Sequence, residues 1–216
     1  MKRDYEDALR IFLPRRTHVV IRIDGRGFHK FSEGLERPYC RALADALDVA
    51  ALYLAQEMID CRFAYGQSDE YSFVLSDSLW FDGNVQKIVS VSASLFTAAF
   101  HRAFESKKIA AFDSRVFVIA QTTEVENYFL WRQLDASANS LNMLASAHYR
   151  HAELVGKSTS EKHELLHAKG VNWAKQAADF KRGRVVKHTA GGWTMDREIP
   201  IFNREPQYLR ELLYTE

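Results

Sequence analysis

Two acidic motifs that lie beside glycine are the residues of this chain most suited to chemistry. Asp24 follows the apolar run 18–23 and precedes Gly25, whereas Asp69 and Glu70 lie in a Gly-Gln-Ser-Asp-Glu sequence between two further apolar runs. Carboxylates that converge beside glycine suit Mg²⁺, most naturally Mg²⁺ that holds a nucleoside triphosphate. Two such ions could stabilise the attacking and leaving oxygens of a phosphoryl or nucleotidyl transfer. On spacing alone, a capping aspartate and an exposed hairpin remain the alternative.

Whether these motifs converge depends on the elements that carry them. The β-branched run 18–23 predicts a strand that ends at Asp24, and residues 62–65 and 71–75 predict two strands whose hairpin connection has Asp69 and Glu70 at its tip. Apolar residues at helical spacing predict a helix over residues 41–59 between them. A right-handed strand-helix-strand unit brings the carboxyl ends of its strands to one edge. If the third strand inserts antiparallel between them, Asp24 and Asp69 meet at that edge.

The next elements complete a known arrangement. We expect a helix over residues 84–104, with Asp82 as a plausible cap, and a strand over 114–119. The resulting order, βαββαβ, is the ferredoxin-like antiparallel sheet with both helices on one face, which is also the palm of many polymerases and cyclases. The predicted fold is therefore α+β, with a C-terminal helical extension that includes a long helix from Thr123 to about His151.

The domain prediction follows from this order. Residues 1–122 would form a palm-like catalytic core, and residues 123–216 a helical and basic part packed on it as a single globular unit. Residues 1–14 are expected to form a short amphipathic helix that ends at Pro14.

Composition narrows the class of protein. The chain has 216 residues, 47% of them hydrophobic and 26% charged, which suits one soluble domain. A formal charge of +1 means that a nucleic-acid ligand would have to bind local basic patches. Cys40 and Cys61 are too few for a disulfide framework, and no segment is apolar enough for a signal peptide or a membrane span. We expect a cytoplasmic protein without membrane association.

Two C-terminal segments suggest other activities. The basic segment over residues 181–188 could contact a phosphate backbone, although a solvated surface is the alternative. The sequence His-Glu-Leu-Leu-His over residues 163–167 matches the H-E-x-x-H pattern of zinc peptidases, but Trp173 stands where the longer pattern requires a third histidine. The RNA-contact candidates of the basic segment are Lys181, Arg182, Arg184 and Lys187.

Three segments taken together carry a more specific resemblance. They are RIDGRGFHKF over residues 22–31, YGQSDEYSF over 65–73 and YFLWRQLD over 128–135. In these segments the chain resembles the tRNA-His guanylyltransferase family and its bacterial and archaeal relatives, the guanylyltransferase-like proteins, and the resemblance extends over about residues 18–188. It implies a polymerase-type palm, usually in a homotetramer, that adds nucleotides to the 5′ end of tRNA, the reverse of the ordinary polymerase direction. That end is activated by adenylylation from ATP or is itself a triphosphate, and GTP or another nucleoside triphosphate is added.

The resemblance also implies roles for residues. Asp24 and Asp69 would hold two Mg²⁺ ions with the Gly25 carbonyl as a further ligand, and Glu70 would be a catalytic residue that orients the site. Lys162 and Glu164 match a Lys-x-Glu-x-Leu motif of the family, which competes with the peptidase interpretation; Arg132 and Lys162 join the RNA-contact candidates. The residues implied to bind nucleotide are Gly25, Arg26, Gly27, Phe28, His29, Arg37, Ser68 and Lys87.

One departure bears on the substrate. Relatives that recognise tRNA-His carry a His-x-Asn-Asn element after the Trp-Arg-Gln motif, but here the run is Ser137-Ala138-Asn139-Ser140. This favours the like-protein branch and templated 5′-end repair over strict tRNA-His guanylylation. Cys40 lies near a position where many relatives have an acidic residue, so the base pocket could differ too. A palm-fold nucleotidyltransferase or cyclase without a tRNA substrate, and a non-catalytic RNA-binding module, remain alternatives.

Overall fold

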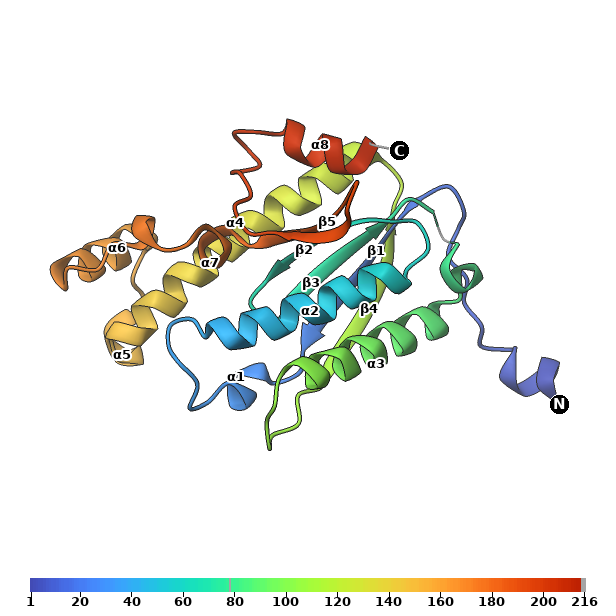
Figure 1. Ribbon diagram of the computed structural model, residues 1–216, viewed down its shortest axis with the longest axis horizontal. Helices are drawn as coiled ribbons and strands as arrows, with labels where there is room; N and C mark the ends of the chain where they lie inside the picture. The colour runs from blue at the N-terminus through green and yellow to red at the C-terminus, as the bar shows by residue number, and fades with distance from the viewer. Residues whose placement is uncertain (78, 215–216) are drawn as a thin grey trace.

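An antiparallel sheet of six strands forms the centre of the molecule. In the computed structural model, which describes residues 1–77 and 79–214, the strand order is β4-β1-β3-β2-β5-β6 (Figure 1). β3 lies between β1 and β2 and pairs antiparallel with both, as predicted. The strand bounds are β1 His18–Gly25, β2 Cys61–Gln67, β3 Glu70–Leu75, β4 Phe112–Ile119, β5 Arg184–Thr189 and β6 Gly192–Asp196.

One face of the sheet is covered by α2 (Arg41–Glu57) and α3 (Val85–Ala103) (Figure 1). Val19, Ile21 and Ile23 occupy alternate positions of β1, so they point to the same face and pack against these helices. Burial of such alternate apolar side chains fixes the register, because a shift by one residue would turn them all to the other face. The predicted α+β class, with α2 and α3 on one face, is confirmed.

The opposite face is covered by α4 (Thr122–His148) and α8 (Gln207–Tyr214). Phe63, Tyr65 and Val74 point away from α2 and pack with Phe129 of α4 and with Phe202. The ring centroids of Phe63 and Phe129 are 4.7 Å apart. Because α4 crosses the sheet on this face, its side chains reach the edge where β1 ends.

The C-terminal part also contributes two strands. β5 pairs with β2 and β6 pairs with β5, and both extend the sheet at the β2 edge. Val185 and Val186 are fully buried there, which accounts for the pairing. The remaining short helices are α1 Phe28–Phe31, α5 His151–Leu154, α6 Thr159–Ala168, α7 Ala178–Arg182, the π-helix η1 Lys2–Glu6 and the 3₁₀ turns η2 Trp80–Gly83 and η3 Trp173–Lys175.

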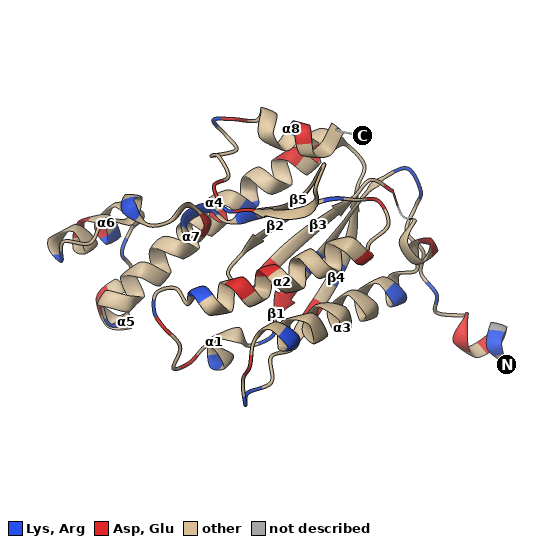
Figure 2. Ribbon diagram, in the orientation of Figure 1, with Lys and Arg blue, Asp and Glu red and all other residues tan. Residues whose placement is uncertain are grey.

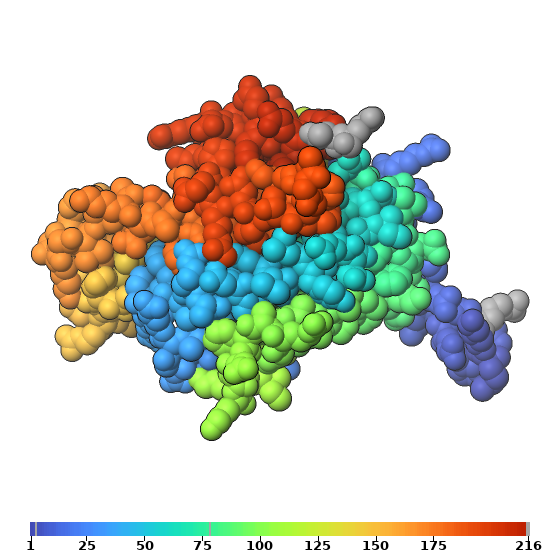
Figure 3. All heavy atoms as spheres, viewed as in Figure 1, coloured from blue at the N-terminus to red at the C-terminus, as the bar shows by residue number. Residues whose placement is uncertain are grey.

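Several local predictions differ from the structure. Helical geometry in the first 14 residues is confined to η1, and Leu9 and Ile11 are exposed because they extend away from the sheet. The cap of α3 is Asn84, whose side chain accepts a hydrogen bond from the Lys87 N–H at 3.1 Å, so Asp82 is not the cap. Figure 3 shows the N-terminal residues and the residues of α6 at opposite ends of the molecule. No helix in the described part of the chain has both the length and the apolar character to cross a bilayer.

Candidate active site

The two acidic motifs meet where β1 ends and β3 begins. β2 and β3 are joined by the two residues Ser68 and Asp69, and Ser68 adopts the left-handed conformation, with φ at 54°, that such a tight turn requires. The sequence analysis places Glu70 at the hairpin tip, but in the structure it is the first residue of β3. A Cβ placed on Gly25 would lie 2.5 Å from Asp69 Oδ2. The Asp69 carboxylate thus packs directly on the Gly25 backbone, beside Asp24.

The negative charges of Asp24 and Asp69 are only partly compensated by nearby cations. Burial raises the pKa of the Asp69 carboxyl, and the negative charge of Asp24 raises it further, against hydrogen bonds from Ser68 and the backbone. The nearest cations to Asp24 are Arg22, whose Nη2 lies 3.3 Å from Asp24 Oδ2, and Arg115, whose Nη2 lies 3.7 Å away. A carboxylate whose ionised form is disfavoured in this way gains from a bound cation.

These donors fit Mg²⁺ that arrives with a nucleotide. The described residues contain no cluster of three histidine, cysteine or acidic side chains that could hold a metal by itself. Two carboxylates and the carbonyl of Gly25 form a smaller, all-oxygen set. Mg²⁺ commonly binds to one or two carboxylates and completes its coordination with water and substrate phosphates. The set therefore suits Mg²⁺ bound together with a triphosphate.

Glu70 has a different environment from Asp69. Arg132 Nη2, from α4, lies 2.6 Å from Glu70 Oε1, and Arg22 donates a hydrogen bond to Glu70 Oε2. Burial raises the pKa of Glu70 despite these two guanidinium groups. Held between two cations, Glu70 orients them, and Arg22 is a site residue that the sequence interpretation missed. The sequence feature that could have identified Arg22 is its position two residues before Asp24, which places both side chains on one side of β1.

Two adjoining cavities open at this edge of the sheet. The cavity here called the acidic cavity has a volume of about 380 Å³ and contains Asp24, Asp69 and Glu70 in its wall. The second, here called the apolar cavity, has a volume of about 250 Å³ and lies between α2, α4 and α7. The two share four lining residues: Gln67, Ser68, Met143 and Ser146. A ligand with a polar, charged part and a flat apolar part could occupy both.

The predicted nucleotide residues divide into two groups. Phe28, His29, Arg37 and Ser68 line the apolar cavity, and Gly27, with φ at 58°, provides the left-handed residue from which α1 begins. Arg26 and Lys87 line neither cavity. The Arg26 backbone N–H donates to Ala111, and the Lys87 ammonium lies 5.2 Å from the centroid of the Phe81 ring.

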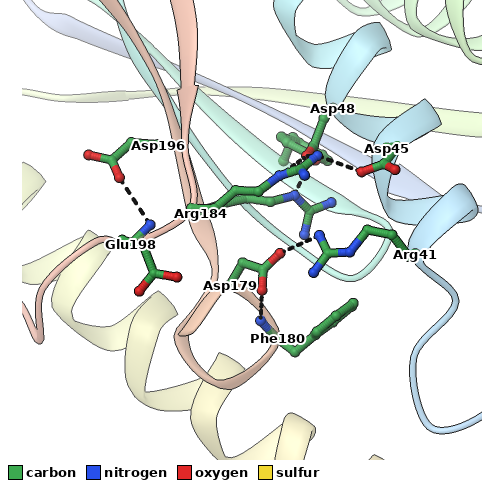
Figure 4. Close-up of polar contacts among 10 residues, drawn as sticks. Arg41, Asp45, Asp48, Asp179, Phe180, Arg184, Asp196 and Glu198 are labelled. Carbon is green, nitrogen blue, oxygen red and sulfur yellow. Dashed lines mark hydrogen bonds and ion pairs between the residues drawn. The ribbon is translucent and has the colours of Figure 1, made fainter. Parts of the chain in front are cut away.

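The RNA-contact candidates also divide. The prediction for Arg184 is wrong, because this side chain is 2% exposed and forms a buried ion pair with Asp48 (Figure 4). Arg132 is mostly buried against Glu70 but lines the acidic cavity, so its role as an RNA contact stays a prediction. Four RNA-contact candidates remain partly exposed: Lys162, Lys181, Arg182 and Lys187. Figure 2 colours all described lysines and arginines blue.

The peptidase motif forms no metal site. His163 and His167 lie on α6, and the ring of His163 packs edge-on against Trp173 at a centroid distance of 5.7 Å. Trp173, which replaces the third histidine of the longer motif, is thus a packing partner. No described residues supply a third ligand to this pair, and the zinc-peptidase alternative has no structural support.

Comparisons with known proteins agree with the geometry. The family model for tRNAHis guanylyltransferase matches residues 1–120. The tRNA(His) guanylyltransferase of Schizosaccharomyces pombe is 33% identical over an alignment of 189 positions that covers 78% of this chain and 72% of that protein. A bacterial tRNA(His) guanylyltransferase-like protein solved in complex with ATP superposes with a TM-score of 0.93 at 37% identity, over 98% of this chain and 97% of that one.

A second solved structure gives the same result. A bacterial tRNA(His) guanylyltransferase-like protein in complex with GTP superposes with a TM-score of 0.82 at 34% identity, over 98% of this chain and 97% of that one. The predicted family is confirmed, and with it the enzyme class, nucleotidyltransferase. This chain belongs to the tRNAHis guanylyltransferase family.

Proposed function

We propose that this protein is a Mg²⁺-dependent 3′-to-5′ nucleotidyltransferase that adds GTP or other nucleoside triphosphates to the 5′ end of tRNA, with ATP as the activating nucleotide. The convergence of Asp24 and Asp69 on the Gly25 backbone carries this proposal. Nucleotidyl transfer relies mainly on positioning and on electrostatic stabilisation of phosphate charge. A partly compensated carboxylate pair beside an apolar cavity provides both a place for the metal-bound phosphates and a place for the base.

Each part of the site has its own task in this proposal. Asp24, Asp69 and the Gly25 carbonyl would hold two Mg²⁺ ions, which neutralise charge on the triphosphate when they are bound. Glu70 fixes the guanidinium group of Arg132 at the wall of the acidic cavity and also binds Arg22 of β1. His29 and Arg37 are exposed at the rim of the apolar cavity, where they can meet phosphate or ribose.

Templated 5′-end repair is the finer part of the proposal. Within the run that replaces the His-x-Asn-Asn element, the hydroxyls of Ser137 and Ser140 bond to backbone carbonyls of the same helix, and Ser140 Oγ accepts a hydrogen bond from Trp173 at 3.0 Å. Of these side chains, Asn139 lines the acidic cavity. A site with so few free polar groups at this position favours selection by base pairing over recognition of one tRNA.

The partner and assembly predictions belong to the same proposal. Lys162, Lys181, Arg182 and Lys187 would contact the acceptor-stem phosphates, since they are the predicted basic residues that keep exposed surface. A homotetramer and a cytoplasmic location complete it. The homotetramer comes from the family resemblance. The cytoplasmic location comes from the small number of cysteines, Cys40 and Cys61.

The test is incorporation of labelled nucleotides at the 5′ end of two tRNAs in the presence of Mg²⁺ and ATP. One is tRNA-His without its extra 5′ guanosine, and the other is a different tRNA that lacks its first nucleotide. We expect extension of both, with the added base set by the opposite base of the acceptor strand. Extension of tRNA-His alone would refute repair, and extension of neither would refute the tRNA substrate.

Two variants complete this test. Asp69→Asn should abolish incorporation, whereas Asp60→Asn, the same substitution at an exposed position between α2 and β2, should not change it. Turnover of triphosphates that continues without tRNA in the wild-type protein would favour the cyclase-like alternative.

A further inference from the structure

Lys108 lies in the loop over residues 104–111, between α3 and β4, and lines neither cavity. Its ammonium donates hydrogen bonds to the backbone carbonyls of Lys30 at 3.0 Å, of Phe31 at 3.4 Å and of Glu33 at 2.9 Å. An ammonium has three donors and no acceptor, so one lysine can satisfy all three carbonyls. These three contacts to one segment distinguish Lys108 from a solvated surface lysine.

The segment over residues 28–33 needs partners for its carbonyls. Its only helix, α1, is four residues long, and the last carbonyls of a helix have no partner within that helix. Lys108 supplies the partner of three of the six carbonyls, and a cation at this end of a helix is favourable. The other three are satisfied within the segment: Phe28 accepts from the Ser32 N–H at 2.9 Å, His29 from the Ser32 hydroxyl at 3.3 Å and Ser32 from the Leu35 N–H at 3.1 Å.

The same segment and the residues after it form one wall of the apolar cavity. Phe28, His29 and Arg37 all line this cavity. The start of the wall is fixed by aromatic packing, since the rings of Phe28 and Phe100 have centroids 6.1 Å apart. Residues 32–37, in contrast, include no buried side chain. The position of that part therefore depends on polar contacts more than on packing.

The loop that carries Lys108 is itself anchored at two points. The Ala110 N–H donates a hydrogen bond to Nε2 of His101, on α3, at 3.2 Å. The Ala111 carbonyl accepts one at 2.8 Å from the N–H of Arg26, just after β1. Figure 1 shows this loop beside α1. Because its own loop is held, Lys108 can fix the cavity wall relative to α3 and β1.

We propose that Lys108 is a positioning residue, which holds residues 28–37 in the conformation that places His29 and Arg37 at the apolar cavity. It thereby sets the affinity for the nucleotide without touching it. This rests on the proposed function only in taking a nucleotide as the ligand. Without the three contacts, a smaller fraction of the protein has the binding-competent wall, and the apparent dissociation constant rises by the same factor.

Binding of GTP to the full chain in the presence of Mg²⁺ tests this with three variants. Lys108→Met removes the ammonium, Lys108→Arg keeps the charge in a planar guanidinium, and Lys107→Met removes the same charge from the neighbouring exposed position. We expect the dissociation constant to rise about five- to twentyfold in Lys108→Met. Lys108→Arg should lie between that variant and the wild type, and Lys107→Met should match the wild type.

The incorporation assay separates positioning from catalysis. Lys108→Met should raise KM for GTP by a similar factor and leave kcat within about twofold of the wild type, because a saturating nucleotide restores the binding-competent wall. Wild-type affinity in Lys108→Met would overturn the role of Lys108 and leave the proposed function standing. A fall in kcat at unchanged KM would also overturn it. So would an equal loss in Lys107→Met, because the effect would then come from net charge.

Hydrogen exchange of the ligand-free chain tests the contacts without a nucleotide. We expect the amides of residues 28–37 to exchange faster in Lys108→Met and not in Lys107→Met. Because both lysines are exposed, the melting temperatures should stay within about 3 °C of the wild type. Unchanged exchange in Lys108→Met would overturn the proposal whether or not the chain binds GTP. Faster exchange in a chain that binds no GTP would instead refute the proposed function.

Discussion

Arg132 of α4 and Glu70 of β3 come from elements far apart in the sequence and form an ion pair, with Arg132 Nη2 2.6 Å from Glu70 Oε1. The same carboxylate binds Arg22 of β1 through its other oxygen. Glu70 thereby joins α4 to β1, which carries Asp24, and to β3, which begins directly after Asp69. We therefore expect Glu70 to act as a positioning residue, although it follows Asp69 directly in the sequence.

Glu70→Gln should separate positioning from metal binding. Glutamine removes the charge between two poorly exposed guanidinium groups, but it also removes the burial cost that raises the pKa of Glu70, so we expect these opposing effects to leave the free energy of unfolding within about 1 kcal/mol of the wild type. Activity should fall about 10- to 100-fold, as for other residues that orient ligands. The Mg²⁺ concentration at half-maximal activity should not change, because Glu70 holds arginines and not the metal. Urea unfolding and Mg²⁺ titrations of the initial rate measure these quantities.

Glu126→Gln is the matched control for this variant. It removes a glutamate on α4 that pairs with Arg210, an exposed residue that lines neither cavity. We expect it to leave the rate unchanged. A large increase in the Mg²⁺ requirement of Glu70→Gln alone would identify Glu70 as a metal ligand instead.

Gly25→Ala should abolish activity although it adds a single methyl group. The added Cβ would lie 2.5 Å from Asp69 Oδ2 and 2.6 Å from a ring carbon of Phe28, so the carboxylate must leave its position. We expect a loss of at least about 100-fold in rate, the size that follows when catalytic groups are misplaced by about 1 Å. Gly191→Ala is the control, since the nearest atom there is 3.8 Å away. Equal activity of both variants would show that contact between Gly25 and Asp69 is not needed.

Much of this fold follows from local sequence patterns. The β-branched run 18–23 and the apolar alternation of residues 71–75 encode β1 and β3 because each buries one or both faces. The βαββαβ order predicts β3 between β1 and β2, and the right-handed crossover brings the ends of β1 and β2 to one edge. Together these two expectations placed Asp24 and Asp69 at that edge before any coordinates were known.

Long-range pairing and burial could not be predicted in this way. The segment over residues 181–188 looks basic and exposed in the sequence, but Arg184 is buried because Asp48, far away on α2, supplies its counter-charge. The burial of Arg132 could not be predicted for the same reason, because its partner Glu70 lies on a different element. A charged residue gives no local signal of whether its partner is water, RNA or a carboxylate from another element.

His163→Ala should leave both the fold and the nucleotidyltransferase activity unchanged. His163 is partly exposed on α6, and its ring contact with Trp173 is a small part of the packing there. We expect a change of no more than about 0.5–1.5 kcal/mol in the free energy of unfolding. Zinc analysis of the purified protein and the incorporation assay measure the two consequences. Stoichiometric zinc that disappears in this variant would revive the peptidase interpretation.

Asp69→Asn should make the metal-free protein more stable at neutral pH while it destroys activity. The folded-state pKa of Asp69 is raised, first by burial and then by Asp24, so the folded chain holds this proton more tightly than the unfolded chain. The stability gained from the protonated form is complete below the unfolded-state pKa and is lost as the pH rises through the folded-state pKa. Asparagine carries no charge at any pH and avoids this loss.

Thermal unfolding between pH 4 and 8, with and without Mg²⁺ and GTP, tests this linkage. We expect the melting temperature of metal-free Asp69→Asn to exceed that of the wild type by more at pH 8 than at pH 4. Mg²⁺ with GTP should raise the melting temperature of the wild type but not of the variant, because ligands stabilise the state that binds them. Activity should fall by more than the roughly 10- to 100-fold typical of outer-shell residues. A variant that melts below the wild type at every pH would show that Asp69 is a structural residue.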